Sequence, residues 1–432
     1  MLSHIYYTFA NYNVHLHTKP QRKMAEELII IRITGEDRPG LTASIMSVLS
    51  RYGVTVLDIG QADIHNTLSL GILIRVEEDY SGHVMKELLF KAGELGVNIK
   101  FFPLGAEDYE AWVKRQGKNR YILTLLGRKL SAGQIEAVTR LIAEQGLNID
   151  SIRRLSGRMS IAEPSKNTRA CIEFSLRGTP HDRNAMQAEL LRLSSEMGMD
   201  CSFQIDNMYR RMRRLICFDM DSTLIQTEVI DELAMRAGVG DKVKDITERA
   251  MRGEIDFKES FTERVALLKG LDSSVMREIA ENLPITEGVD RLMYVLKRYG
   301  YKIAILSGGF TYFGEHLQKK YGIDYVYANE LEIDEHGKLT GRYLGEIVDG
   351  RRKAELLKLI AQVEKVDIAQ TIAVGDGAND LPMLSEAGLG IAFHAKPRVV
   401  ANAQQSINTI GLDGVLYFLG FKDSYLDEKG RE

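Results

Sequence analysis

Two stretches in the first half of the chain carry the same order of hydrophobic and polar patterns. Each shows one strand pattern, a helix pattern, two strand patterns, a second helix pattern and a final strand pattern. Apolar residues at every second position predict strands, and apolar residues three or four positions apart predict helices. We expect the two units over 27–104 and 118–206, with a charged linker over 105–117. The chain is therefore predicted to contain a degenerate repeat of roughly 90 residues with the order βαββαβ.

The second half of the chain alternates strand and helix patterns around one long helical segment. The apolar run Leu215–Phe218 predicts a buried strand, and no further strand pattern occurs before about Tyr301. Later strands alternate with helices, which is typical of a mostly parallel sheet that binds ligands at the carboxyl ends of its strands. The helical segment then resembles a lid. The expected bounds are 207–225 and 286–422 for this α/β core, 226–285 for the helical cap and 423–432 for a C-terminal tail.

The composition fits several folded domains. A chain of 432 residues is too long for one ordinary core. With 44% hydrophobic residues, 27% charged residues and a net charge of −4, neither disorder nor strong attraction to nucleic acid or an anionic membrane is indicated. The basic run "YRRMRR", Tyr209–Arg214, contains four arginines. We interpret it as a solvated linker between domains, because no aromatic interleaving follows.

The sequence also indicates a compartment. No apolar stretch approaches the ~20 residues that span a bilayer, and the first 23 residues lack the apolar centre of a signal peptide. We expect 1–26 to be a poorly ordered tail, or Met24 to be an alternative translation start. Cys171, Cys201 and Cys217 show no metal or disulfide spacing, and Cys217 lies in an apolar strand. These features favour a reducing cytoplasm.

Two carboxylates, Asp219 and Asp221, directly follow the Leu215–Phe218 strand. Side chains two positions apart in an extended chain point to the same side. At about 4 Å two such charges repel by roughly 4 kcal/mol at an effective dielectric near 20, so a cation or a retained proton must compensate. Further polar segments follow near the same edge of the predicted sheet. They are Ser307-Gly308-Gly309, Lys353, and "GDGAND" with Asp376, Asn379 and Asp380.

Taken in this order, the segments form a set for phosphoryl transfer. Asp219 is placed to attack phosphorus and form an aspartyl phosphate. Asp221 can protonate the departing alkoxide and later deprotonate water. The carboxylates of Asp219 and Asp376, with the backbone carbonyl of Asp221, are hard oxygen ligands that suit Mg²⁺. The cation would explain how crowded carboxylates stay ionised.

The remaining members of the set would hold the phosphoryl group. The Ser307 hydroxyl and the Gly308 amide can bind its oxygens, and Lys353 can neutralise its charge. We expect Asn379 to contact the substrate and Asp380 to support the metal site. Taken singly, each segment has a plainer interpretation, because Ser-Gly-Gly is often a turn, a lone lysine lies at a surface and "GDGAND" is a glycine-rich loop.

Residues 215 to about 420 resemble the haloacid dehalogenase superfamily of phosphatases through "DMDST", "SGG", Lys353 and "GDGANDLPML". Within it, "FDMDSTLIQTEVIDELA" resembles the phosphoserine phosphatases, which carry a short helical cap. The resemblance implies a Rossmann-like core with a parallel sheet. It also implies that Glu228 faces the substrate ammonium and Arg264 its carboxylate, while Met251 and Phe257 wall the pocket. The alternative is that these four residues only support the cap, Glu228 at a helix start and Arg264 beside its helical neighbours.

The two amino-terminal units resemble ACT domains, small ferredoxin-like modules that commonly bind amino acids. The resemblance rests on "GEDRPGL", which includes Asp37, Arg38 and Gly40 and leads into a helix whose free amides could receive a carboxylate. The second unit has "GRKLSAGQ" instead. For that unit, a structural or dimerising role is at least as well supported as ligand binding.

The expected activity is Mg²⁺-dependent hydrolysis of O-phospho-L-serine to L-serine and phosphate, the final step of serine biosynthesis. Two alternatives stay open: a phosphotransferase that passes the phosphoryl group to an alcohol such as homoserine, and an amino-acid sensor on a phosphatase scaffold. No GxxxxGK[ST] segment is present, which disfavours a P-loop kinase. We expect a homodimer with serine as an effector. No required acid or lysine precedes Leu215, so a chain starting near Asn207 is expected to keep hydrolysis.

Overall fold

The computed structural model describes residues 25–114, 117, 119–158, 168–427 and 430. The expected leader of 23 residues lies outside these ranges. The chain forms two compact units, one ending at Gly117 and the other beginning at Lys118.

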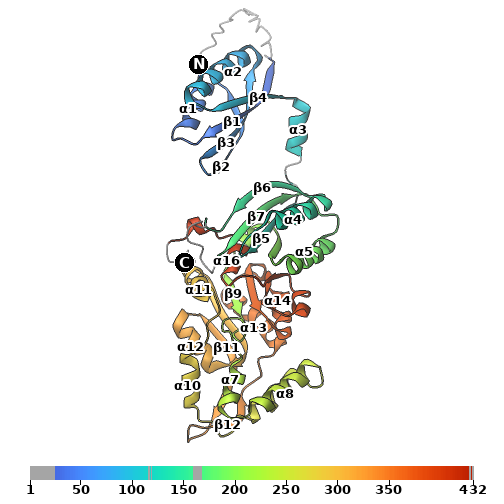
Figure 1. Cartoon of the computed structure of the whole chain (residues 1–432), viewed down its shortest axis with the longest axis vertical. Helices are drawn as coiled ribbons and strands as arrows, with labels where there is room; N and C mark the ends of the chain where they lie inside the picture. The colour runs from blue at the N-terminus through green and yellow to red at the C-terminus, as the bar shows by residue number, and fades with distance from the viewer. Residues whose placement is uncertain (1–24, 115–116, 118, 159–167, 428–429, 431–432) are drawn as a thin grey trace, which may run out of the picture. The chain divides into compact units, whose positions relative to one another are not determined.

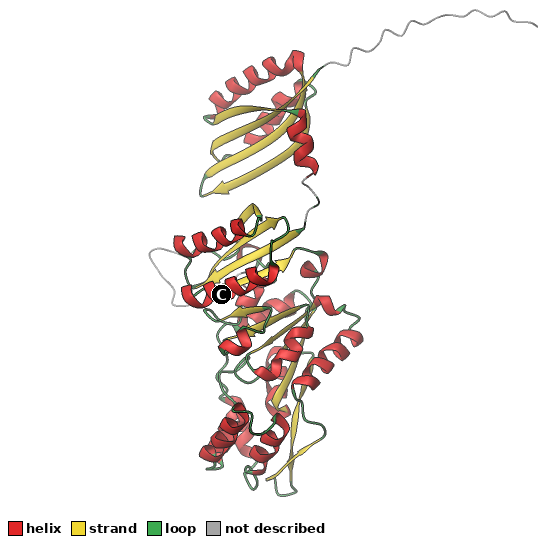
Figure 2. Ribbon diagram, turned by 90° about the vertical axis from the view of Figure 1, so that its right-hand side faces the viewer, coloured by secondary structure: helices red, strands yellow, loops and turns green. Residues whose placement is uncertain are grey.

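The first unit is a four-stranded antiparallel sheet packed against two helices (Figure 1). Its strand order is β2-β3-β1-β4, and Figure 2 shows its strands in yellow and its helices in red. Buried residues of β1 alternate with less buried ones, so Ile29, Ile31 and Ile33 face the helices. The elements are β1 (Glu26–Glu36), α1 (Leu41–Arg51), β2 (Thr55–Ile64), β3 (Thr67–Glu77), α2 (Glu78–Leu95) and β4 (Asn98–Leu104), followed by α3 (Ala106–Lys114).

The second unit begins with a domain of the same topology. Its strand order, β6-β7-β5-β8, matches that of the first unit strand for strand, which confirms the predicted repeat. The helices begin at side-chain caps, since Asp182 accepts hydrogen bonds from the first-turn amides of α5. The elements are β5 (Arg120–Gly127), α4 (Ala132–Glu144), β6 (Asn148–Arg154), β7 (Ala170–Arg177), α5 (Arg183–Met197) and β8 (Asp200–Ile205).

The core of the second unit is a seven-stranded sheet between two layers of helices. Its order is β12-β11-β10-β9-β13-β14-β15, and every pair is parallel except the antiparallel pair β11–β12. In β9, Ile216 and Phe218 belong to one buried cluster and Leu215 and Cys217 to another, because successive side chains point to opposite faces. The strands are β9 (Leu215–Phe218), β10 (Lys302–Phe310), β11 (Tyr325–Ile333), β12 (Leu339–Leu344), β13 (Thr371–Gly375), β14 (Leu389–Phe393) and β15 (Gln405–Ile407).

Helices cover both faces of this sheet. Apolar residues of α11 and α12 join the first cluster, and those of α13 and α14 join the second. The α-helices are α6 (Met208–Arg211), α11 (Val289–Arg298), α12 (Thr311–Tyr321), α13 (Gly350–Val363), α14 (Leu381–Glu386), α15 (Pro397–Val400) and α16 (Gly414–Phe418). Short 3₁₀ turns are η1 (Ile368–Gln370), η2 (Ala378–Asp380) and η3 (Asp423–Tyr425).

The helical insertion after β9 forms a separate layer of four helices. Between β9 and β10 the structure has no further named strand, as the pattern predicted. The chain leaves and rejoins the core at adjacent points, because Ile225 and Ile285 form an antiparallel bridge. Gln226 N–H also donates to the carbonyl of Pro284 at 2.8 Å. The helices are α7 (Val229–Arg236), α8 (Gly240–Met251), α9 (Phe257–Ala266) and α10 (Ser274–Glu281).

The second βαββαβ domain and the core share one buried interface. Leu126, Leu155 and Cys171 belong to the same hydrophobic cluster as the core residues of the first face. The side chain of Gln405, the first residue of β15, accepts from Phe203 N–H at 3.0 Å and donates to Phe203 carbonyl at 3.1 Å. It therefore completes the backbone hydrogen bonds of β8 from the neighbouring sheet. The two domains fold as one unit.

Polar contacts reinforce this interface. The Arg128 guanidinium donates to both oxygens of Glu287, at 2.7 and 2.6 Å. In the segment expected as a C-terminal tail, Asp423 is buried and accepts hydrogen bonds from Gly157 N–H and Arg291. Because Arg–carboxylate pairs with two parallel bonds fix orientation as well as position, these contacts define how the domain sits on the core.

The interpretation of "YRRMRR" as a solvated linker is wrong for two of its arginines. Arg210 and Arg213 are 7% and 5% exposed, whereas Arg211 and Arg214 are exposed. The reason is that the linker is short and passes between the second domain and the core, so part of it joins their interface. Separately, the described residues contain no helix long and apolar enough to cross a membrane. Cys217 is a fully buried free thiol, as predicted.

Candidate active site

The carboxyl ends of three neighbouring strands meet at one edge of the core sheet. β9 lies at the centre, with β10 on one side and β13 on the other. Asp219 and Asp221 follow β9, and Asp376 follows β13. Ser307 lies inside β10, where the pairing with β11 becomes irregular before Phe310. The residues that the sequence pattern assigned to strand ends are therefore spatial neighbours.

A fully buried lysine joins two of the acids. Lys353 Nζ lies 2.8 Å from Asp219 Oδ2 and 2.7 Å from Asp380 Oδ1. Burial alone would lower the pKa of Lys353, but the two carboxylates outweigh it and hold that pKa above its usual value. The ammonium group is therefore a fixed positive charge beside Asp219.

Three carboxylates form a group that could hold a metal ion. One oxygen each of Asp219, Asp376 and Asp380 lies within 4.8 Å of the others. Burial, followed by the charges of Asp219 and Asp380, raises the pKa of Asp376 to about 8, although the Thr223 hydroxyl donates to it at 3.2 Å. A divalent cation would relieve this repulsion. A site made only of carboxylate oxygens has the chemistry of a Mg²⁺ site.

Asp221 is not part of that carboxylate group and has a different environment. It is buried, and its Oδ1 accepts a hydrogen bond from Val229 N–H at 3.2 Å. Burial, together with the charges of Glu228 and Asp219, raises the pKa of Asp221 well above its usual value. A raised pKa favours the protonated form, and a protonated acid beside the Asp219 carboxylate could donate a proton to a leaving group.

Ser307 and Gly309, both in β10, form the surface of the site beside Asp221. The Ser307 hydroxyl, fully buried, accepts a hydrogen bond from Gly309 N–H at 2.9 Å. A Cβ at Gly309 would overlap the Asp221 carboxylate and approach Met220 Cε to 2.9 Å. A larger residue at this position would fit only if the side chains of Asp221 and Met220 moved.

Gly308 is one of the residues of the core that the cap contacts. A Cβ at Gly308 would lie 3.0 Å from Phe257 Cζ, so the aromatic ring closes over this peptide. The Asn329 amide donates to Gly308 carbonyl at 2.8 Å and accepts from Val348 N–H at 2.8 Å. Asn329 thus fixes the orientation of the Gly308 peptide.

Two charged cap residues lie near the acids. Arg264, on α9, is half-buried, and its Nε donates to the carbonyl of Ser260 at 3.3 Å. No carboxylate of the described residues lies within ion-pair distance of it; burial lowers its pKa, while Glu228 and Asp231 oppose the shift. Glu228 is exposed, and its Oε1 accepts a hydrogen bond from the Ser222 hydroxyl at 2.8 Å. The surrounding protein atoms, and then the Asp219 charge, raise the pKa of Glu228. Both groups could gain a partner from a zwitterionic ligand.

Met251 and Asn379, two further residues that the sequence assigned to the site, are at least partly exposed. Met251, at the end of α8, is 63% exposed, and Lys396 Nζ approaches its sulfur to 3.8 Å. Asn379 lies in η2 and is half-buried. Glycines make room for it, since a Cβ at Gly377 would overlap its side chain and a Cβ at Gly350 its backbone.

The candidate effector residues lie in the first unit. Asp37, Arg38 and Gly40 are exposed in the turn before α1. Gly40 has φ 86° and no side chain, so it caps α1 without occupying the first-turn amides. In the second domain Ser131 fills the equivalent place, accepting from Gln134 N–H in a capping box. Of these two equivalent helix starts, the first has no side-chain cap and the second has one.

Sequence reasoning missed two supporting residues. Thr223, which binds Asp376, belongs to the motif "DMDST", and its spacing from Asp219 could have indicated a role. Asn329 gave no such signal, because "YANE" reads as an ordinary strand segment.

Comparisons with known proteins agree with this architecture. Two ACT domain profiles match residues 27–102 and 120–204, and a profile described as haloacid dehalogenase-like hydrolase matches 213–388. The phosphoserine phosphatase of Streptomyces coelicolor is 39% identical over 393 residues, which cover 91% of this chain and 92% of the relative. The chain belongs to the phosphoserine phosphatase family. A second member, from Mycobacterium tuberculosis, is 38% identical over 92% of this chain and 94% of its own length.

Solved structures extend the likeness to the fold of this phosphoserine phosphatase family member. A probable phosphoserine phosphatase from Vibrio cholerae, in unliganded form, matches with a TM-score of 0.54 and 34% identity, over 69% of this chain and 86% of that one. A haloacid dehalogenase family hydrolase from Salmonella enterica matches with a TM-score of 0.59 and 30% identity, over 69% of this chain and 98% of that one. The Rossmann-like core and the ferredoxin-like ACT domains predicted from the sequence are therefore confirmed.

Proposed function

We propose that the protein hydrolyses O-phospho-L-serine to L-serine and phosphate through an aspartyl phosphate on Asp219. The observation that carries this proposal is the position of Asp219. Its carboxylate contacts a buried lysine and belongs to the carboxylate group that suits a metal ion. The cap carries Arg264, which has no carboxylate within ion-pair distance among the described residues. In a phosphorylated amino acid, the phosphate matches the groups around Asp219, and the amino-acid carboxylate matches Arg264.

In the first step an oxygen of Asp219 attacks phosphorus, forming the new P–O bond as the ester P–O bond to serine breaks. Asp221 gives its proton to the departing serine oxygen. In the second step water attacks the aspartyl phosphate, Asp221 takes the proton from the water, and the carboxylate of Asp219 is released with phosphate. The raised pKa of Asp221 supports a protonated start.

Other residues hold the phosphoryl group during both steps. We assign Ser307, the Gly308 amide and Asn379 to its oxygens, and Lys353 to the charge shared by Asp219 and phosphate. A metal ion, which we propose to be Mg²⁺, would be held by Asp219, Asp376 and the backbone carbonyl of Asp221, with Asp380 in support. When bound, it would withdraw charge from the phosphoryl oxygens.

The cap would read the amino-acid part of the substrate. We assign Arg264 to the carboxylate and Glu228 to the ammonium group, with Met251 and Phe257 as apolar walls. The contact between Phe257 and Gly308 supports this, because it brings the cap wall directly against the proposed phosphate site.

The ACT domains would regulate and assemble the enzyme. We propose that serine binds at Asp37, Arg38 and Gly40, where the first-turn amides of α1 lack a side-chain cap. We also propose a homodimer, and the cytoplasm as the location, which the free buried cysteines fit.

The test is phosphate release from a panel of phosphomonoesters, each with and without an alcohol acceptor such as homoserine. We expect phosphoserine to be hydrolysed far faster than esters that lack either the amino or the carboxyl group. Transfer to the acceptor in place of phosphate release would identify a phosphotransferase. No turnover of any ester with divalent metal present would refute the enzyme assignment.

A further inference from the structure

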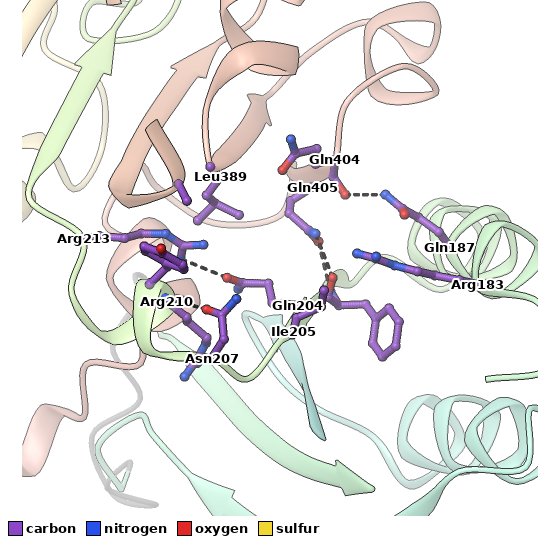
Figure 3. A pocket seen from close by; sticks show the side chains of 14 residues that line it. Arg183, Gln187, Gln204, Ile205, Asn207, Arg210, Arg213, Leu389, Gln404 and Gln405 are labelled. Atoms are coloured by element: carbon purple, nitrogen blue, oxygen red, sulfur yellow. Dashed lines mark hydrogen bonds between the residues drawn. The ribbon is translucent and has the colours of Figure 1, made fainter. Parts of the chain in front are cut away.

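A cavity of about 180 Å³ lies in the second unit, where the ACT domain meets the amino-terminal edge of the core sheet (Figure 3). It opens between β8, the linker that follows it and the start of β14. Asp219 follows the opposite, carboxyl end of β9, so this cavity is separate from the candidate active site. The phosphatase chemistry proposed above does not use any of its residues.

The charge of the cavity lining is one-sided. Three arginines, Arg183, Arg210 and Arg213, line it, and the lining contains no aspartate or glutamate. The charge of Arg210 is balanced, because its Nη2 lies 2.8 Å from Glu173 Oε2, although its Nε has no hydrogen-bond partner. Arg183 is exposed at the start of α5, and no ion pair is found for it among the described residues. The cavity therefore carries an excess of positive charge.

Arg213 is the decisive residue. Only 5% of it is exposed, and Nη1 donates to Gln204 Oε1 at 2.9 Å. Its Nε has no hydrogen-bond partner, and within the described part of the chain no carboxylate lies at ion-pair distance from it. A buried charge without a partner is strongly unfavourable, and proteins normally pair such groups. Burial and the nearby Arg210 lower the pKa of Arg213 to about 10, which still leaves it charged at neutral pH.

The glutamine side chains around the cavity form hydrogen bonds with the protein backbone, and as neutral amides they cannot balance the charge of Arg213. Gln187 donates to Gln404 carbonyl at 2.8 Å, and Gln405 uses both of its amide atoms on Phe203. Figure 3 shows these glutamines on one side of the cavity and Arg213 on the other. The charged donors in the lining are guanidinium groups, whose planar arrangement matches the paired oxygens of carboxylate and phosphate. The volume is below that of sites for drug-sized ligands, which suits a small anion.

We propose that this cavity binds a small oxyanion, an inorganic phosphate or the carboxylate of an amino acid, through Arg213, with Arg183 at its mouth. The bound anion supplies the missing counter-charge. Because the cavity wall includes both the ACT domain and the core, the anion also strengthens the contact between them.

The experiment is calorimetric titration of the full-length protein with inorganic phosphate and, separately, with L-serine, in a chloride buffer. Arg213→Gln keeps a polar side chain but removes the charge, and Arg211→Gln is the matched control, since that arginine is exposed on the same linker. We expect the wild type and the control to bind one more equivalent of one of the two ligands than Arg213→Gln does. The ligand that loses the equivalent identifies the source of the oxyanion.

A second variant makes the result independent of folding at the buried position. Arg183→Gln changes an exposed residue and should weaken the same binding event about tenfold, as expected for losing one charge-assisted contact. Inhibition of hydrolysis by phosphate should be unchanged in all three variants, which separates this site from the active site. Equal stoichiometry for both ligands in the wild type and Arg213→Gln, with unchanged affinity in Arg183→Gln, would overturn the proposal.

Discussion

Replacing Arg264 with alanine tests whether the cap recognises the amino-acid part of the substrate. The guanidinium is half-buried on α9 and, among the described residues, has no carboxylate within ion-pair distance. Glu228 and Asp231 influence it only through longer-range charge. If the substrate carboxylate forms an ion pair with Arg264, removing the arginine leaves that carboxylate desolvated and unpaired in the closed site.

The size of the effect follows from that geometry. Breaking a buried ion pair by removing one partner costs about 3–5 kcal/mol. At 1.36 kcal/mol for each tenfold change in rate, this corresponds to a loss of roughly 150- to 5,000-fold in kcat/KM for phosphoserine. p-Nitrophenyl phosphate has no carboxylate, so its kcat/KM should fall less than about tenfold, through altered cap packing alone.

The assay compares kcat/KM for the two esters in Arg264→Ala and in a control, Arg236→Ala. Arg236 lies on α7 of the same cap, is exposed and forms an ion pair with Glu278 at 2.7 Å. The control should change neither ester by more than about twofold, since exposed ion pairs contribute little. An equal loss for both esters in Arg264→Ala would refute the reasoning, because the arginine would then only support the cap.

Further predictions concern Asp219, Asp376, Gly309 and the boundary between the two units. Asp219→Asn should stay folded but lose hydrolysis, checked by phosphate release and circular dichroism; normal turnover would exclude the covalent step. The raised pKa of Asp376, about 8, means that metal-free protein loses stability as pH rises toward 8, and that calorimetric Mg²⁺ affinity increases up to that pH as the proton is displaced. Gly309→Ala should abolish activity with a small change in melting temperature, because the new Cβ would displace the Asp221 carboxylate; retained activity would contradict that packing. The chain 118–432 should fold and hydrolyse phosphoserine, whereas 207–432 should melt much lower or aggregate; equal melting of both would show that the shared core is unimportant.

The prediction for the chains 118–432 and 207–432 differs from the expectation drawn from the sequence. The absence of required acids before Leu215 indicated that a chain from about Asn207 would suffice. That argument considered chemistry only. Because Leu126 and Cys171 complete the hydrophobic cluster of the core, the structure favours a boundary at Lys118 instead.

Most of the fold could be predicted because its signals are local. The run Leu215–Phe218 was predicted with the bounds that the structure has, because four consecutive apolar residues lie between the charged residues Arg214 and Asp219. The chemistry at the strand ends was equally visible, because strand order brings Asp219 and Asp376 to one edge.

What could not be predicted depends on contacts between distant segments. The burial of Arg213 depends on how the second domain packs, and a run of arginines usually indicates a solvated surface. The role of Asn329 depends on the Gly308 carbonyl, which only the folded sheet brings into reach. Side chains whose partners are backbone groups far along the chain leave no pattern in the sequence.

The antiparallel bridge between Ile225 and Ile285 has a consequence for how selectivity and chemistry can vary independently. The chain departs from the core and returns at neighbouring backbone positions. The intervening segment is therefore an insertion that is joined to the core at two adjacent positions. A segment of different length or shape could replace it while the strand ends that carry Asp219 and Asp376 keep their register. The reaction at phosphorus would then stay constant, and the identity of the group attached to the phosphate would become a property of the exchangeable insertion.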